Sequence, residues 1–378
     1  MADSAHPLGS HPIDYDEFLQ SDTDVSTCEC HKRFICSCKI EGEEIIETKT
    51  TKIMLGDSIG CGNFSTIRLG LNVNTGEPCA VKLSSRHDMK GSAWTVMTNQ
   101  QKEVAYLKRE DDDRIIGEYK TYILLDAVEK KEQKRYYANL PIVFECGFYR
   151  DSVFMTMELL GPDLLDLFIV CDNRFSLKTV LQILLQLIKT LKYVHNCGIL
   201  HRDIKPDNCM IGKKANKTEN NIFLVDFGNS RELIDRRRNA HIRPKIGQSL
   251  HGNARFASLN VHLGKEVSRR DDLESLLYMM VYFLKGTLPW QGLESKDISD
   301  LWTMVADTKR ITPLSILCEG LPDEFLNFAR YIRKLSFFDT PDYDYWSKQF
   351  VNLYKEMKYS NINEYDWTHV INSDSESE

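Results

Sequence analysis

The sequence predicts an α+β fold of two lobes, a small strand-rich N-terminal lobe and a larger, mainly helical C-terminal lobe. Short apolar runs suited to strands come first, at residues 53–59, 66–71 and 79–82. Two strong helical patterns follow in the second half of the chain, at residues 177–194 and 271–285. We therefore expect strands and helices to separate into two lobes.

Two glycines lie in the turn between the first two strand-like runs. Gly60 and Gly62 allow the backbone to pass close to phosphate oxygens and present N–H groups to them. A Gly-x-Gly sequence is also an ordinary hairpin turn, so this motif does not decide the function by itself. The third run ends at Lys82, and this order and spacing predict a lysine that binds the α- and β-phosphates of a nucleotide.

Such a lysine needs a carboxylate to hold it in place. Residues 101–107 read as a helix because Val104 and Leu107 form an apolar pair at helical spacing. Glu103 on this segment is the predicted partner of Lys82, and Glu110 is the alternative.

The two helices of the second half differ in their apolar pattern. Residues 177–194 carry one apolar stripe, with Ser176 as N-cap and Gly198 at the end. Residues 276–284 are apolar on every face, which predicts a helix buried on all sides. Asp272, near the start of this helix, either anchors the backbone of the preceding loop or complements the helix dipole.

The sequence between the two helices indicates phosphoryl transfer. The decisive string is His201-Arg202-Asp203-Ile204-Lys205-Pro206-Asp207-Asn208, followed by Asp226-Phe227-Gly228. Asp203 would accept the proton of an attacking hydroxyl, and Lys205 would bind the γ-phosphate of ATP. Asn208 and Asp226 would hold the two Mg²⁺ ions that bridge the ATP phosphates. An isolated Asp-Phe-Gly is common in turns, but the complete string at this spacing is specific.

Composition and charge narrow the class of protein. The chain has 378 residues, of which 42% are hydrophobic and 27% charged, as in ordinary globular proteins. A net charge of −7 argues against nucleic-acid binding through bulk charge. The N-terminus lacks the pattern of a signal peptide, and the longest apolar run, residues 276–284, is too short for a membrane span. We therefore expect a cytoplasmic or nuclear protein, with reduced cysteines and no membrane partner.

Three regions follow from the distribution of periodic structure. Residues 1–50 are expected to be a disordered, cysteine-containing arm, and residues 51–367 a single domain with lobes at about 51–158 and 159–367. Residues 368–378 form an acidic, serine-rich tail. Four cysteines of the arm could bind zinc, but their C-x-C spacing is tighter than in most zinc sites, and reduced thiols on a flexible arm are the alternative. These are Cys28, Cys30, Cys36 and Cys38.

Further motifs resemble the casein kinase 1 group of the eukaryotic protein kinases. The similar segments are residues 157–162, 252–260, 268–276, 288–293 and 341–343. The resemblance covers roughly residues 53–367 and implies a bilobal kinase fold, ATP and Mg²⁺ as cofactors and serine/threonine residues of proteins as substrates. Met157 would be the gatekeeper, and Glu158 and Leu160 would offer backbone groups to adenine. The expected ATP site comprises Ile59, Gly60, Gly62, Ile67, Ala80, Lys82, Met157, Glu158 and Leu160.

The resemblance also implies a preference for acidic or already phosphorylated protein substrates. Arg255 would bind the anion beside the substrate groove, while Arg202 and Arg231 would form a second anion site. In the alternative interpretation, each arginine pairs with a local carboxylate. We expect the enzyme to be a monomer.

Three departures from the group limit the inference. Ser65 replaces the usual third glycine of the phosphate loop, and Asn229-Ser230 replace the usual Leu-Ala after Asp-Phe-Gly. About two dozen extra residues are expected between Glu103 and Met157, after the helix that carries Glu103, and they are rich in charge at residues 110–114 and 129–135. They form either a docking element or a solvated loop. A nucleotide-binding scaffold without turnover is therefore the alternative to an active kinase.

Overall fold

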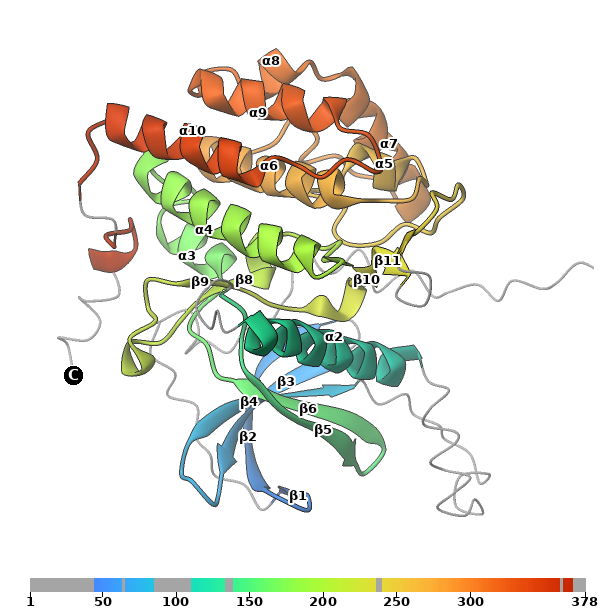
Figure 1. Cartoon of the computed structure of the whole chain (residues 1–378), viewed down its shortest axis with the longest axis vertical. Helices are drawn as coiled ribbons and strands as arrows, with labels where there is room; N and C mark the ends of the chain where they lie inside the picture. The colour runs from blue at the N-terminus through green and yellow to red at the C-terminus, as the bar shows by residue number, and fades with distance from the viewer. Residues whose placement is uncertain are drawn as a thin grey trace, which may run out of the picture.

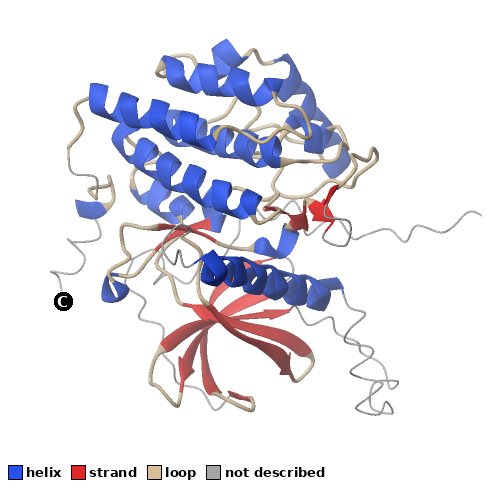
Figure 2. Cartoon of the chain, viewed as in Figure 1, coloured by secondary structure: helices blue, strands red, loops and turns tan. Residues whose placement is uncertain are grey.

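The structure is a computed structural model that describes residues 44–62, 65–84, 110–132, 139–235, 240–360 and 363–369. Strands gather in the N-terminal lobe and helices in the C-terminal lobe (Figure 2). The expected α+β architecture of two lobes is therefore present.

An antiparallel six-stranded sheet forms most of the N-terminal lobe. Its strand order is β1-β2-β3-β4-β6-β5. Leu55, Val81 and Phe154 are buried on this sheet, as expected for β-branched and apolar residues on an inward face. The strands are β1 Ile45–Glu47, β2 Lys52–Gly62, β3 Ser65–Asn72, β4 Pro78–Ser84, β5 Val143–Tyr149 and β6 Ser152–Glu158.

The first strand corrects the predicted boundary of the N-terminal arm. β1 lies inside residues 1–50, yet it pairs with β2, and Ile46 is buried. Glu44, just before β1, forms ion pairs with Arg68 and Arg150 of the same lobe. The domain therefore includes these residues. The predicted boundary was wrong because a three-residue edge strand in a mixed polar sequence carries too little pattern to be recognised. The four cysteines of the arm lie outside the described residues.

The long helix α2, Glu110–Glu132, packs on the sheet and faces the C-terminal lobe (Figure 1). Its buried residues Ile115, Tyr122 and Leu125 recur at helical spacing. The charged residues 110–114 therefore open this helix, and the segment 129–132 closes it, whereas the sequence analysis placed both in an insertion after the helix. The predicted helix at residues 101–107 lies outside the described residues.

The C-terminal lobe contains both helices that the sequence analysis predicted. In α4 the Ser176 side chain accepts a hydrogen bond from Thr179 N, which confirms the N-cap. In α6 all residues from Asp271 to Leu284 are buried, and Gly286 ends the helix with a φ of 79°. The helices are α3 Leu164–Val170, α4 Leu177–Asn196, α5 Leu259–His262, α6 Arg269–Lys285, α7 Ile298–Ile311, α8 Leu314–Leu317, α9 Asp323–Lys334 and α10 Tyr343–Glu356.

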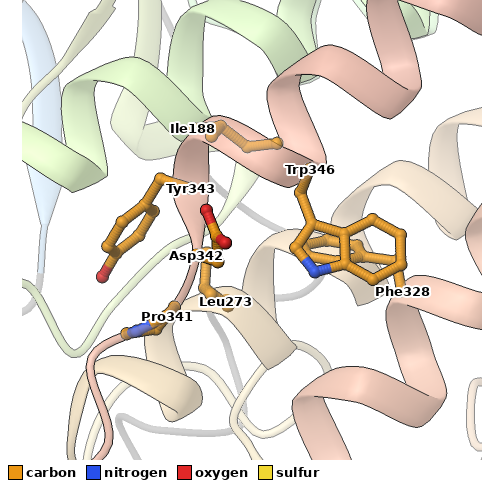
Figure 3. A pocket seen from close by; sticks show the side chains of 7 residues that line it. All are labelled: Ile188, Leu273, Phe328, Pro341, Asp342, Tyr343 and Trp346. Carbon is orange, nitrogen blue, oxygen red and sulfur yellow. The ribbon is translucent and has the colours of Figure 1, made fainter.

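Apolar packing between these helices is tight. Ile188, Leu273, Phe328 and Trp346 surround a gap between α4, α6, α9 and α10 that leaves no room for a water molecule (Figure 3). The gap is therefore packed core and offers no ligand site. No helix in the described part of the chain is long and apolar enough to cross a membrane.

Three short two-stranded ladders flank the loops between the lobes in the described part of the chain. β8 Cys209–Ile211 pairs with β9 Ile222–Leu224, and β7 Ile199–Leu200 pairs with β10 Arg231–Glu232. A third ladder joins β11 Ile234–Asp235 to β12 Ala240–His241. The first two ladders bring the loop after β7 and the segment after β9 to the same place between the lobes (Figure 1).

Candidate active site

The predicted phosphate-binding lysine lies between two carboxylates. Lys82 on β4 is buried, and its Nζ is 2.7 Å from Glu118 Oε2 on α2 and 2.9 Å from Asp226 Oδ1. Burial lowers the pKa of Lys82, but the two carboxylates outweigh it and hold this pKa above its usual value. For Asp226, burial raises the pKa and Lys82 lowers it more, so the pKa is below its usual range. The lysine and Asp226 are therefore charged at neutral pH.

This ion pair corrects the predicted partner of Lys82. The carboxylate comes from Glu118, whereas the sequence analysis assigned Glu103 and kept Glu110 as the alternative. Glu103 lies outside the described residues, and Glu110 is the first residue of α2. The reason is geometric: the part of α2 that packs against β4 lies two turns after its start, where Glu118 is buried.

The predicted base Asp203 is buried in the loop after β7, where several polar groups surround its carboxylate. Lys205 Nζ lies 3.5 Å from Oδ2, and Asn208 Nδ2 lies 3.2 Å from the same oxygen. Asn229 Nδ2 is 3.4 Å from Oδ2, and Asn253 N donates to Oδ1 at 3.2 Å. These contacts with a lysine and amide donors fix the orientation of the carboxylate.

Asp272 of α6 binds the backbone of this loop through hydrogen bonds to its side-chain carboxylate. Its two oxygens accept hydrogen bonds from His201 N and Arg202 N, each at 2.8 Å, and Oδ2 also contacts His195 Nε2 at 2.8 Å. Arg202 has a φ of 71°, which is unfavourable for a residue with a side chain. The anchoring role of Asp272 is therefore confirmed, and it stabilises a strained backbone beside Asp203.

Aromatic rings connect α2 to the Asp-Phe-Gly segment. Phe227 is buried with its ring centroid 5.1 Å from that of Tyr122 and 4.7 Å from that of His201. Asp226 N donates to the Tyr122 hydroxyl at 3.2 Å. Tyr122 lies one turn after Glu118 on α2, so the helix that supplies the ion pair also fixes the position of Asp226.

The expected nucleotide residues lie on neighbouring strands. Gly60 and Ile67 are paired across the β2–β3 hairpin, and Ala80 and Met157 are paired between β4 and β6. Glu158 N donates to Ile142 O at 2.7 Å, so this residue would offer its carbonyl to a base. The other expected residues, Ile59, Gly62 and Leu160, belong to or directly follow these strands.

Comparison with known proteins agrees with this geometry. Residues 53–357 match the family model described as the protein kinase domain. The chain belongs to the protein kinase family. It is also 38% identical over 318 residues, 84% of this chain, to Casein kinase I homolog 3 of Schizosaccharomyces pombe. The match spans 65% of that relative's length. The predicted resemblance to the casein kinase 1 group is confirmed by this similarity.

The residues of the kinase fit the expected cofactor chemistry. The Asn208 side-chain N–H donates a hydrogen bond to Asp203 O, with an Nδ2–O distance of 2.8 Å. The amide oxygen of Asn208 is then available to a metal. The Asp226 carboxylate would supply the second oxygen ligand, and Mg²⁺ prefers such oxygen donors. Asn208 and Asp226 would therefore hold Mg²⁺ bound to ATP, which neutralises charge on the phosphates.

The three arginines of the predicted anion sites differ in their surroundings. Arg231 pairs with Glu266 Oε1 at 2.7 Å and also donates to Gln248 at 3.3 Å, as in the alternative interpretation. Burial and then the charge of Arg231 lower the pKa of Arg202, whose buried Nε has no hydrogen-bond partner among the described residues. Arg255 lies over the rings of Phe256 and Tyr282. Arg202 and Arg231 are thus close together, but a carboxylate partly neutralises the second.

The departures from the group make new polar contacts in the kinase. Ser65 pairs with Gly62 in the β2–β3 ladder, so a serine at this position keeps the hairpin. Asn229 contacts the Asp203 carboxylate, as described above. The Ser230 hydroxyl lies 3.2 Å from Thr121 Oγ1 on α2, beside a hollow of about 310 Å³ between α2 and the Asp-Phe-Gly segment. These substitutions therefore leave the active-site contacts in place.

Sequence analysis missed four residues that contact the active-site groups. Glu118 and Tyr122 could have been found from the apolar spacing of α2, because Ile115, Tyr122 and Leu125 mark its inner face. Asn253 lies in a segment identified by resemblance, without a role for its backbone. Asn229 was noted only as a departure, and nothing in the local sequence indicates that it contacts Asp203.

Proposed function

We propose that the protein is an active serine/threonine kinase of casein kinase 1 type, which transfers the γ-phosphate of ATP to hydroxyl groups of proteins. The observation that carries this proposal is the joint placement of Lys82, Glu118 and Asp226 in one ion-pair cluster. Kinases require this lysine–glutamate pair and this aspartate to be in place together for catalysis.

The remaining residues supply the chemistry of transfer. Asp203 would orient the attacking hydroxyl and accept its proton, since several polar contacts fix the position of its carboxylate. Lys205, 3.5 Å from Asp203, would stabilise negative charge on the transferred phosphoryl group. Lys82 would hold the α- and β-phosphates. Positioning and charge stabilisation then account for most of the rate enhancement.

Incubation of the purified protein with casein, ATP and Mg²⁺ tests this proposal. Phosphoserine or phosphothreonine should form in proportion to enzyme and should disappear when EDTA removes the metal. Absence of incorporation, although the protein still binds nucleotide, would favour a scaffold without turnover.

We propose further that the enzyme prefers an acidic or phosphorylated residue three positions before the target. Arg255 supports this proposal because it lies two residues after Asn253, whose backbone N–H donates to Asp203. A guanidinium makes two parallel charge-assisted bonds to phosphate. Arg231 of the second anion site should contribute little to this preference because Glu266 partly neutralises it.

A peptide pair that differs only in phosphoserine or alanine at this position tests the preference. The wild type should favour the phosphorylated peptide, and Arg255→Ala should remove most of that preference without changing KM for ATP. An unchanged preference in the variant would show that Arg255 does not bind the anion. A monomeric state and a cytoplasmic or nuclear location remain proposals from the sequence.

A further inference from the structure

A buried lysine lies beneath the segment that follows the activation loop. Lys309 of α7 is only 2% exposed, although a lysine is almost never buried without a partner. Its Nζ donates to Ala254 O at 2.8 Å and Ala257 O at 2.6 Å, and lies 3.1 Å from His262 Nε2 of α5. The helices α5 and α7 lie side by side at one end of the C-terminal lobe (Figure 1).

Aromatic rings complete the surroundings of Lys309. Its nitrogen is 5.0 Å from the ring centroids of both Tyr278 and Trp290, which favours a cation by its position over the ring faces. Removing an ammonium group from water is nevertheless costly. The fold therefore keeps a lysine here at a cost, and its hydrogen bonds go to the backbone of residues 254–257.

A second donor holds the same segment. Trp290 Nε1 donates to Arg255 O at 2.8 Å. The carbonyl groups of Ala254, Arg255 and Ala257 thus all accept hydrogen bonds from side chains of the C-terminal lobe. This leaves the backbone of the segment fixed from its inner side.

The fixed segment reaches the catalytic loop through Asn253. Asn253 Oδ1 accepts from Arg255 N at 2.8 Å, and Asn253 O accepts from Ala257 N at 2.8 Å. Asn253 N donates to Asp203 Oδ1. The preceding Gly252 has a φ of 74°, and a Cβ there would lie 2.9 Å from Arg202 O, so the chain approaches the catalytic loop closely.

We propose that Lys309 is a positioning residue for the protein substrate. It fixes residues 253–257, which carry Arg255 and contact Asp203, relative to the catalytic loop. This inference rests on the proposed function, because it concerns the surface on which the substrate protein would lie. The residues expected to bind the nucleotide lie on or beside β2–β4 and β6, none of which contributes to the surroundings of Lys309.

Lys309→Met tests this role because methionine has a similar length and cannot donate a hydrogen bond. We expect kcat/KM for casein to fall about 10-fold or more, since small displacements near reacting groups reduce rates strongly. The proposal requires that KM for ATP, and the rate of ATP hydrolysis without protein substrate, each change by less than about twofold. Lys309→Arg, which keeps donors, should recover part of the loss.

Two further variants separate positioning from general stability. Arg310→Met, at the next and exposed position of α7, should leave both activities unchanged. Trp290→Phe removes the donor to Arg255 O and keeps a smaller aromatic ring at this position. It should reproduce the selective loss more weakly, even if Lys309→Met does not fold. Equal casein kinetics in folded Lys309→Met, or parallel loss of ATP hydrolysis, would overturn the proposal.

Hydrogen–deuterium exchange decides the structural part independently of activity. Amides of residues 253–257 should exchange faster in Lys309→Met, or in Trp290→Phe, than in the wild type, while those of residues 65–84 should not change. Unchanged exchange at residues 253–257 would refute the anchoring. A wild type that fails to phosphorylate casein would instead refute the proposed function, and this exchange measurement would still decide whether Lys309 holds the segment.

Discussion

At the scale of single residues, the active site depends on charges that are fixed in pairs. Lys82 is placed between Glu118 and Asp226, and Asp203 is placed among Lys205 and three amide donors. Preorganised charges of this kind stabilise the transition state more than flexible ones, because they need not reorganise during the reaction. The carboxylate that pairs with Lys82 should therefore affect the catalytic rate, and its identity can be tested by kinetics.

Replacement of Glu118 by glutamine tests that identity. Lys82 would lose one charged partner, so kcat/KM for casein should fall by roughly 10²-fold, a typical effect of removing one preorganised group. The matched variant Glu103→Gln changes the carboxylate that the sequence analysis favoured and should retain wild-type turnover. Steady-state kinetics are compared at matched thermal stability. Impaired turnover in Glu103→Gln, with wild-type turnover in Glu118→Gln, would contradict the assignment of Glu118.

The residues of the catalytic loop could be predicted from the sequence because their order and spacing are fixed by the chemistry. Asp203, Asn208 and Asp226 each lie where the motif indicates. The partner of Lys82 could not be predicted in this way, because it belongs to a different element. Its position depends on how α2 packs against β4, and Glu103 lies on the first helical pattern after Lys82, whereas the packed helix begins at Glu110.

At the scale of elements, helices of the C-terminal lobe fix loops of the active site through buried polar groups. Asp272 of α6 binds the catalytic loop, and Lys309 of α7 binds residues 254–257. The helices α4 and α6 were predicted to within two residues because their apolar patterns are long and regular. The short strands and β1 were not, because two or three residues carry too little pattern and their pairing depends on distant segments.

His262 of α5 makes the stability of this region dependent on pH. Burial and then the charge of Lys309 lower the pKa of His262 to about 3, whereas an unfolded histidine titrates near ~6.5. Below that value the unfolded chain binds a proton that the folded protein excludes. Stability should therefore fall as the pH decreases from about 6.5, by up to ~1.4 kcal/mol per pH unit from this group.

Urea unfolding of the wild type and His262→Asn at pH 7.5, 6.5 and 5.5 measures this contribution. The variant should lose less stability than the wild type between pH 6.5 and 5.5, although it is less stable at pH 7.5. Parallel pH profiles of the two proteins would show that His262 does not titrate on unfolding in this range.

At the scale of the whole molecule, the two lobes meet in an arrangement suited to catalysis. The ion pair of Lys82 joins β4 to α2, and Phe227 packs between Tyr122 of α2 and His201 of the catalytic loop. The described part of the activation segment is held by protein contacts alone. Ile246 pairs with Lys265, Gln248 N donates to Gly264 O, and Asn253 N donates to Asp203.

Phosphorylation of the activation segment should therefore not be required for activity. Protein produced without other protein kinases and treated with phosphatase, which is then removed, should retain at least about half of its casein kinase activity. The expectation follows from contacts that already order the segment, whereas many kinases need a phosphate for this purpose. Loss of activity after the treatment, restored by rephosphorylation, would contradict it.

The role of Asp203 as base is the central claim, and casein phosphorylation by Asp203→Asn tests it most directly. Asparagine keeps the shape of the side chain but removes its charge and its ability to accept the proton. With Mg²⁺ and saturating ATP, we predict a loss of about 10²-fold or more in kcat, with nucleotide affinity and thermal stability near those of the wild type. The exposed neighbour Asp207→Asn provides a matched control and should keep wild-type turnover. Equal phosphate incorporation by the wild type and Asp203→Asn would contradict the account.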